Sequence, residues 1–427
     1  MASEDSGKAV SDTTGITQYN IPFDREQLVG TLYHEFKEIN LKPGSLETII
    51  KMIAAIYDIR TQPLVDRCKE LYTYFNPDDT YGLPALPPDE VQKKEKDFYS
   101  MLEKLLNEAD FTRITKEELV KSTQEEGLLP LSLNVNWDYF ETVRLYYKGR
   151  SIGTEKVPHL VIPLLKKKVK FEYYNNFILV FKYREEEYFK KRKIKLKAKF
   201  GKIYIKYLVN VPCADIEMVF PGATPRITYF DKAKISIPIL TCLGTVFYKY
   251  GLYPLFYYNQ IPYYYSFERI TKFDSPPLSL SAGMFALFVA LISYSIKVYS
   301  SYKQTVQDIL AKVTSTLYFK NIMSNLAVIR NLATSGVEEN IKKTLLLYLF
   351  LVRSGRPHMA PELEKEIEEW FQNRHGIRVD FDSEEVLEAM EEIGLLRQSG
   401  DTIEVRVPPG SLIPHLTRFW HEMKQQQ

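Results

Sequence analysis

Cysteine is scarce in this sequence of 427 residues, and the motifs of common catalytic and metal sites are missing. Its three cysteines, Cys68, Cys213 and Cys242, are isolated and form no CxxC pair. This spacing argues against a disulfide framework and a zinc site, and it favours a reducing environment. No HExxH, GxGxxG, GxxxxGKS/T or GxSxG pattern occurs. The sequence therefore predicts no catalytic residue, metal or cofactor, and it leans away from an enzyme.

Charge is missing from two long stretches. Residues 275–296 hold 22 uncharged residues, enough for a helix of about 30 Å, the thickness of a bilayer's hydrocarbon core. A second apolar segment, Ile235 to Tyr258, has one charged residue, Lys249. This lysine lies toward the far end of the segment, where its ammonium can reach the membrane–water interface. We expect a two-helix transmembrane hairpin over residues 234–298, or else one spanning helix beside a buried amphipathic segment. Basic residues flank both ends of the hairpin, which places both large parts of the chain on one side of the membrane.

The first residues also lack targeting signals. Residues 1–18 are small and polar, with no apolar core of a secretory signal and no arginine-rich transit peptide. They are predicted to form a disordered tail. From residue 19 to about 130 the pattern becomes helical, for example in the stripe of Leu28, Leu32 and Phe36. This indicates a helical N-terminal region.

Residues 131–233 change to a period of two, which is typical of strands. Between Lys148 and Lys206 there are 18 basic and 5 acidic residues. The segment 193–200 (KIKLKAKF) alternates lysine with apolar residues, and Asn175-Asn176 separates two apolar runs as a hairpin turn would. We expect a basic, antiparallel β-rich domain with one buried face and one lysine-rich face.

The lysine-rich face is the strongest candidate for binding. Because the predicted hairpin follows it closely, we expect anionic lipid head groups of a bilayer as its partner, at roughly 1 kcal/mol for each basic residue. RNA is an alternative, with Tyr183, Tyr188 and Tyr204 stacking on bases. The acidic C-terminal module and plain solvent are further alternatives. The residues of this anionic-surface-binding site are Lys166, Lys167, Lys168, Lys170, Lys190, Lys191, Arg192, Lys193, Lys195, Lys197 and Lys199.

The C-terminal part is predicted as a helical connector over residues 299–336, a winged-helix-like module over 337–410 and a tail over 411–427. The winged-helix interpretation rests on the order helix, helix, strand, helix and hairpin. The helix that would enter a DNA groove, Ser383 to Ile393, carries five glutamates and no basic residue. Since binding to nucleic acid depends on neutralising phosphates, nucleic acid is a disfavoured partner, and unknown protein partners are favoured.

One pair of carboxylates offers a different function. Asp215 and Glu217 are two residues apart, so in an extended segment they would share one strand face. Such a pair can hold a divalent cation or serve an uncharacterised enzyme. Pairing with the many nearby lysines is the plainer interpretation.

The chain also resembles the transmembrane protein 143 family, whose members share a domain of unknown function. The resemblance rests on short blocks in a common order. These are Tyr19–Phe23, Trp137–Phe140 with Arg144–Tyr147, Val211–Pro221, Asp231–Lys232, Tyr318–Asn321 with Asn325, Lys343–Tyr348, and Val379–Phe381 with Gly394–Leu396. The resemblance implies a membrane protein, in animals a mitochondrial one, and it carries no catalytic residues.

These observations predict an α+β, membrane-anchored protein with four parts in chain order. They are a helical N-terminal region, a basic antiparallel β-rich domain, a two-helix transmembrane hairpin and a winged-helix-like C-terminal module. The expected function is that of a non-enzymatic scaffold or lipid-contacting protein integral to the membrane.

Overall fold

A computed structural model describes residues 17–36, 43–79, 87–115, 117–119, 133–158, 166–225 and 320–426, with isolated residues between 240 and 311. The chain forms two compact units. The first comprises residues 1–128, 136–216 and 320–427, and the second comprises residues 129–135 and 217–319. In the second unit, β3 (Leu133–Asn134) pairs antiparallel with β7 (Thr224–Pro225). The sheet and the long helices belong to the first unit.

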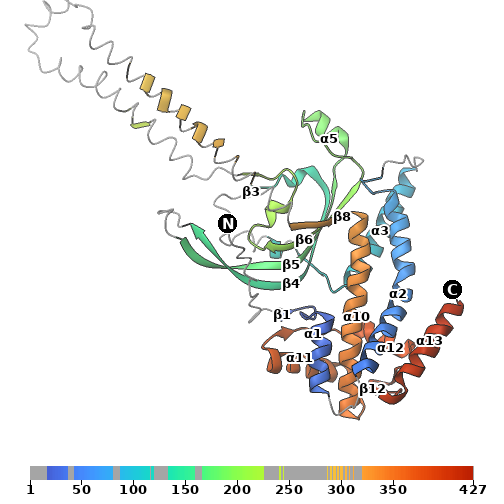
Figure 1. Ribbon diagram of the computed structural model, residues 1–427. Helices are drawn as coiled ribbons and strands as arrows, with labels where there is room; N and C mark the ends of the chain where they lie inside the picture. The colour runs from blue at the N-terminus through green and yellow to red at the C-terminus, as the bar shows by residue number, and fades with distance from the viewer. Residues whose placement is uncertain are drawn as a thin grey trace, which may run out of the picture. The chain divides into compact units, whose positions relative to one another are not determined.

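The first unit is built on a five-stranded antiparallel sheet in the order β2-β4-β5-β6-β8. The long hairpin of β4 and β5 forms much of this sheet (Figure 1). Consecutive residues of β5, from Phe177 to Phe181, are all almost fully buried, so both faces of the sheet are covered at its centre. The strands are β2 (Thr112–Arg113), β4 (Phe140–Pro158), β5 (Lys166–Tyr183), β6 (Ile203–Pro212) and β8 (Asn321–Ser324).

Two long helices, α2 (Pro43–Thr73) and α10 (Leu326–Ser354), pass through two separate hydrophobic cores. In the first core, the second half of α2, α3 (Pro88–Glu108) and the start of α10 pack on the sheet. In the second core, the first half of α2 and the remainder of α10 pack with α1 (Arg25–Glu35) and the C-terminal elements. Gly336 of α10 lies where the helix meets the end of α3, since a Cβ there would be 3.2 Å from the carbonyl oxygen of Glu108.

The C-terminal elements complete the second core. A three-stranded sheet in the order β11-β12-β9 packs with three helices, and β1 (Thr17–Gln18) pairs in parallel with β10. The observed order differs from the predicted helix, helix, strand, helix and hairpin by one short strand, β9, which lies between the first two helices. Residues 412–426, which the sequence assigned to a tail, form a helix that buries Leu412 and Leu416. The elements are β9 (His358–Met359), α11 (Ala360–His375), β10 (Arg378–Val379), α12 (Glu384–Glu392), β11 (Leu396–Ser399), β12 (Thr402–Val405) and α13 (Leu412–Gln426).

The described residues also include several short helices. They are α5 (Glu186–Lys191), which follows β5, and the 3-10 helices η2 (Trp137–Tyr139), η3 (Ile216–Val219) and η6 (Pro409–Ser411).

The predicted transmembrane hairpin, and with it the integral membrane protein, is wrong. Within the described ranges, no helix combines the length and the apolar character that crossing a bilayer requires. Apart from isolated residues, the hairpin segment 234–298 lies outside those ranges. The prediction rested on the absence of charge, which overstates hydrophobicity here, because residues 275–296 include five serines and two prolines.

Two local predictions in the β-rich region are also wrong. Residues 193–200 belong to no strand, although Lys193, Lys195, Lys197 and Lys199 are exposed and the apolar residues between them are partly buried. Asn175-Asn176 is not a turn, because β5 runs through both residues. The hairpin joins β4 to β5 instead.

Candidate functional site

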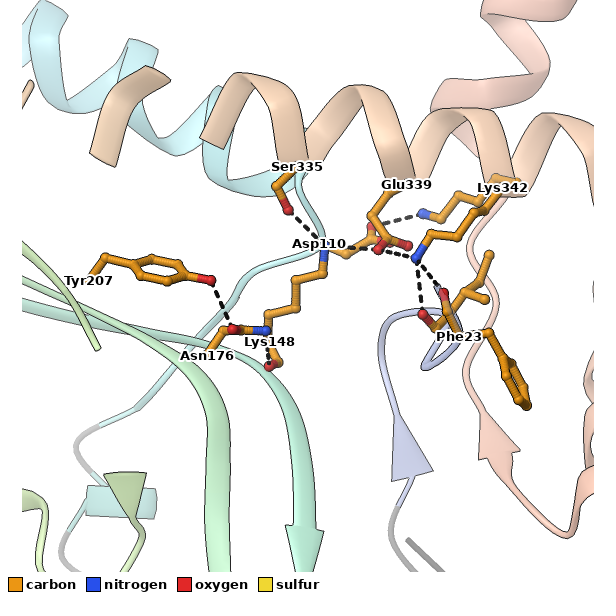
Figure 2. A network of polar contacts seen from close by, with 10 residues as sticks. Phe23, Asp110, Lys148, Asn176, Tyr207, Ser335, Glu339 and Lys342 are labelled. Carbon is orange, nitrogen blue, oxygen red and sulfur yellow. Dashed lines mark hydrogen bonds and ion pairs between the residues drawn. The ribbon is translucent and has the colours of Figure 1, made fainter. Parts of the chain in front are cut away.

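A buried group of charged side chains lies on α10, between the residues that this helix contributes to the two hydrophobic cores. Glu339, Lys342 and Lys343 all belong to this helix and are at most 9% exposed. They meet Lys148 from β4 and Asp110, which follows α3 (Figure 2). We call these five residues the charge network.

Glu339 is the centre of the charge network. Its Oε1 lies 2.9 Å from Nζ of Lys148 and 2.5 Å from Nζ of Lys342. Lys342 also donates to the backbone carbonyl oxygens of Ile21, at 3.1 Å, and Phe23, at 3.3 Å. The network therefore ties α10 to the sheet on one side and to the N-terminal segment on the other (Figure 2).

A second ion pair lies beside the first. Nζ of Lys343 donates to Oδ1 of Asp110 at 2.8 Å. Three ammonium groups thus face two carboxylates. Within the described residues, Oε2 of Glu339 and Oδ2 of Asp110 are buried without a hydrogen-bond partner. Each carboxylate thus keeps one oxygen available to a further donor.

The two carboxylates respond differently to burial. Burial by itself would raise the pKa of Glu339, but attraction to Lys148 and Lys342 outweighs it and holds the pKa below its ordinary value. For Asp110 burial dominates over the attraction of Lys343, and it raises the pKa to about 6. Glu339 is therefore the permanent anion of the network, whereas Asp110 can take up a proton near neutral pH.

This difference predicts an unusual pH dependence of stability. The folded chain protonates Asp110 as the pH falls through about 6, whereas the unfolded chain does so only near the ordinary value of 3.8. Between these values the folded state binds more protons, so the stability contributed by Asp110 increases as the pH falls. We expect the free energy of unfolding of the natural protein, minus that of Asp110→Asn, to be larger at pH 5 than at pH 7.5. Urea unfolding at both pH values measures this, and an unchanged or smaller difference at pH 5 would contradict it.

The geometry does not support a serine nucleophile here. Nζ of Lys148 donates to Oγ of Ser335 at 3.0 Å, which is the distance of a serine–lysine catalytic pair. However, the same Nζ lies 2.9 Å from Oε1 of Glu339 and is engaged in an ion pair there. The contact with Ser335 therefore orients the lysine and does not activate the serine.

A cavity of about 610 Å³ opens beside the charge network. Glu339, Lys342 and Ser335 line it, together with Tyr207 from β6 and residues 23–27. Its lining is mostly polar or charged, and Arg25 pairs with Glu338 at 3.2 Å among the lining residues. The hydroxyl of Tyr207 donates to Asn176 at 2.8 Å (Figure 2). The cavity has the size of a small-molecule site, and two of its charged lining residues, Glu339 and Lys342, are paired with each other.

The charge network was not predicted from the sequence. Its signal is the spacing of Glu339, Lys342 and Lys343, which share one side of α10 just before its apolar segment. Charged residues at positions that face a core are expected to be paired. The partners Lys148 and Asp110 lie about 190 and 230 residues earlier in the sequence, respectively, so no local pattern identifies them.

The predicted lysine-rich face is divided in the structure. Lys166, Lys167, Lys168 and Lys170 lie at the start of β5, whereas the other members follow the end of that strand. At about 3.3 Å per residue, the length of β5 between Lys170 and Tyr183 is about 43 Å. The side chains of residues 166–168 lie outside the described part. We call residues 190–199 the basic segment.

Several members of the basic segment already have partners. Lys190 pairs with Glu186 at 3.0 Å and Lys191 with Glu187 at 3.6 Å, both within α5. The guanidinium of Arg192 lies 3.9 Å from the ring centre of Tyr188. Nζ of Lys199 donates to the carbonyl oxygen of Pro77 at 2.6 Å. Within the described part of the chain, Lys193, Lys195 and Lys197 form no ion pair and are exposed.

The predicted carboxylate site near Asp215 and Glu217 takes a different form. The strand β6 ends at Pro212, and Glu217 lies in the 3-10 helix η3. The two residues therefore do not share a strand face as predicted. Both have interactions in the structure. Among the described residues, no group of three histidine, cysteine or carboxylate side chains is arranged to hold a metal ion.

One comparison with known proteins bears on this chain. The model of a family described as a protein of unknown function, DUF3754, matches residues 140–327. These residues include β4, β5, β6 and β8 of the sheet, so the central region resembles an uncharacterised domain family. No solved structure matches the chain.

Proposed function

We propose that the protein binds phosphate-bearing anionic surfaces through the basic segment, as a peripheral contact made from the water side. The observation that carries this proposal is the exposure of Lys193, Lys195 and Lys197 at alternate positions. Lys193 lies in the turn after α5 and has a left-handed backbone, at φ 56°, so the alternation of an extended chain applies to Lys195 and Lys197. In an extended chain alternate side chains point the same way and lie about 6.6 Å apart, so these two lysines present positive charge to one side.

The electrostatics of such a row suit a membrane surface carrying anionic head groups. Each basic residue close to an anionic leaflet contributes roughly 1 kcal/mol, and the contribution falls off within a Debye length. Ile194 and Leu196 are partly buried on the other side of the segment, which supports the lysines from beneath. The resulting contact is salt-dependent and requires no segment that enters the bilayer.

RNA is the rival partner, and the aromatic contacts disfavour it. Tyr183 is buried, and Tyr204 stacks on Phe181 with ring centres 5.1 Å apart. Arg192 lies over the ring of Tyr188. Base stacking contributes much of the binding of single-stranded nucleic acid, so rings that are already engaged in the protein weaken the case for RNA.

Vesicle sedimentation of the full chain tests this proposal. We expect the protein to bind vesicles containing phosphatidylserine and not neutral vesicles, and the double variant Lys195→Gln/Lys197→Gln to bind about 30-fold more weakly at low salt. The matched control Lys93→Gln/Lys96→Gln removes two exposed lysines from α3 and should bind like the natural protein. Equal binding to neutral vesicles, or equal losses in both variants, would refute the proposal. If the double variant lost binding to single-stranded RNA but bound the vesicles like the natural protein, the basic segment would be assigned to RNA instead.

We also propose that the chain is related to the transmembrane protein 143 family. Three of the blocks that carry this resemblance, Arg144–Tyr147, Val211–Pro221 and Tyr318–Asn321, lie within the region matched by the family model. The relationship is one of sequence alone. A structure of a member of that family with the sheet order β2-β4-β5-β6-β8 would support it, and a different sheet would remove it.

A further inference from the structure

Trp137 is an exposed tryptophan in a chain that has three. It is 42% exposed, whereas Trp370 is 9% exposed and Trp420 is partly buried. It begins the 3-10 helix η2, which directly precedes β4. Tryptophan joins a large apolar ring system to one N–H donor, so it is favoured where an apolar phase meets water. A single exposed apolar residue is common on protein surfaces, so the surroundings of Trp137 decide what its exposure means.

The surroundings of Trp137 are fixed by Phe189, a buried residue of α5. The ring of Tyr139, in the same 3-10 helix as Trp137, packs on Phe189 with ring centres 5.5 Å apart. The carbonyl oxygen of Tyr139 also accepts from the backbone N–H of Arg184 at 3.0 Å. Phe189 contacts the basic segment as well, because its carbonyl oxygen accepts from the N–H of Ile194 at 3.0 Å. The helix η2 and the basic segment are therefore both attached to α5, which projects from the end of the sheet (Figure 1).

The chain around α5 is positively charged. Residues 184–199 include eight basic and three acidic side chains. Two of the acidic ones, Glu186 and Glu187, pair with lysines of α5. On η2 itself, Asp138 is an exposed carboxylate. An exposed tryptophan beside several lysines and arginines is typical of proteins that bind anionic membranes from the water side, because the basic groups contact head groups while the ring enters the interfacial layer.

We propose that Trp137 anchors the protein in the interfacial layer of an anionic lipid bilayer, beside the head groups that the basic segment contacts. This inference rests on the proposed function and deepens it, since it makes the partner a bilayer and not only an anionic surface. Lys195 and Lys197 supply the salt-dependent part of the contact. The ring of Trp137 supplies an apolar part, which salt does not screen.

Tryptophan fluorescence of the full chain tests this inference on the natural protein. When vesicles of phosphatidylcholine and phosphatidylserine are added, we expect the emission to shift to shorter wavelength, because the ring of Trp137 leaves water. We expect the emission to be quenched when the phosphatidylcholine carries bromine on its acyl chains. Both changes should be absent from Trp137→Phe, in which the emission comes from Trp370 and Trp420 alone.

Vesicle sedimentation at two salt concentrations separates the ring from the lysines. We expect Trp137→Ala to bind about tenfold more weakly than the natural protein, both at about 0.1 M and at about 0.5 M salt, because burial of an apolar ring is not screened. The loss in Lys195→Gln/Lys197→Gln should instead become smaller as the salt concentration rises. The matched control is Tyr33→Ala, which removes an exposed ring from α1 in the second core and should bind like the natural protein.

The possible failures of this inference and of the proposed function are distinguishable. Vesicle binding by the natural protein without a shift of its emission would overturn the inference and leave the proposed function standing. Equal losses in Trp137→Ala and Tyr33→Ala would do the same. An emission change caused by single-stranded RNA and not by vesicles would assign the ring to base stacking instead. A natural protein that bound no vesicles would refute the proposed function and the inference together.

Discussion

Replacing Glu339 by glutamine is expected to lower the free energy of unfolding by about 3–5 kcal/mol. The change keeps the shape of the side chain and removes its charge, so the buried ammonium groups of Lys148 and Lys342 lose the carboxylate that both contact. Uncompensated buried charges are among the most destabilising features of a protein interior. Urea unfolding followed by circular dichroism measures the change.

The neighbouring residue supplies the control. Glu338 precedes Glu339 on the same helix, but it pairs with Arg25 near the surface, where both side chains are about 40% exposed. Exposed ion pairs contribute at most about 1 kcal/mol. We therefore expect Glu338→Gln to cost less than about 1 kcal/mol. Similar losses in the two variants would mean that Glu339 is no more important than a surface charge.

Asn325→Ala is expected to destabilise the protein by about 3–5 kcal/mol. Asn325 begins α10 with a left-handed backbone, at φ 55°. Its Oδ1 accepts from the backbone N–H of Ile205 at 3.1 Å, and its Nδ2 donates to Asp78 at 2.7 Å. Alanine would leave the N–H of Ile205 without this acceptor and would strain the backbone. Thermal and urea unfolding measure the loss.

Two further variants separate the causes of this loss. Asn325→Gly relieves the backbone strain but, like alanine, lacks the side-chain hydrogen bonds. It should therefore lower the free energy of unfolding by about 1 kcal/mol less than Asn325→Ala. Asn210 also has a positive φ, of 51°, but it is exposed. Asn210→Ala should therefore show the strain alone, at about 1–2 kcal/mol. If Asn210→Ala lowered the free energy of unfolding as much as Asn325→Ala, the loss in Asn325→Ala could not be attributed to the buried hydrogen bonds.

The period-two hydrophobic pattern correctly predicted strands where a neighbouring strand is present to pair with them. The period of two over residues 131–233 indicated strands, and Ile203 and Ile205, two residues apart, are buried in the strand β6. The same alternation in residues 193–200 indicated a strand that does not form. A strand forms only where a neighbouring strand is available to pair with it, and a local sequence pattern does not show whether such a partner exists. The pattern correctly predicted which side of the segment is exposed.

The turn predicted at Asn175-Asn176 failed for a specific reason. Gly149 on the opposite strand has φ +77°, and a Cβ at that position would lie 2.9 Å from Nδ2 of Asn175. The register of the two strands is continuous there, with Lys148 opposite Asn176 and Arg150 opposite Tyr174. Asn175 therefore lies beside a glycine of unusual backbone conformation in the middle of a long strand pair. Asparagine favours turns, but the pairing of β5 with β4 and β6 keeps this segment in a strand.

The candidate site was less predictable than the fold. Lysines in consecutive and alternate positions are visible in any sequence, and they predicted the basic segment as an exposed surface. The charge network depends on residues brought together from β4, α10 and the turn after α3. The absence of charge, in contrast, was a poor guide to a membrane-spanning helix, because it does not measure hydrophobicity.

A double-mutant cycle tests most directly whether the charge of Glu339 joins the sheet to α10. The four proteins are the natural chain, Lys148→Met, Glu339→Gln and the variant with both changes. We predict that the sum of the two single losses of stability exceeds the loss in the double variant by at least about 2 kcal/mol, because the attraction between Lys148 and Glu339 is lost in each single variant but only once in the double variant. Losses that add to within about 0.5 kcal/mol would show that the two residues are independent and would contradict this account.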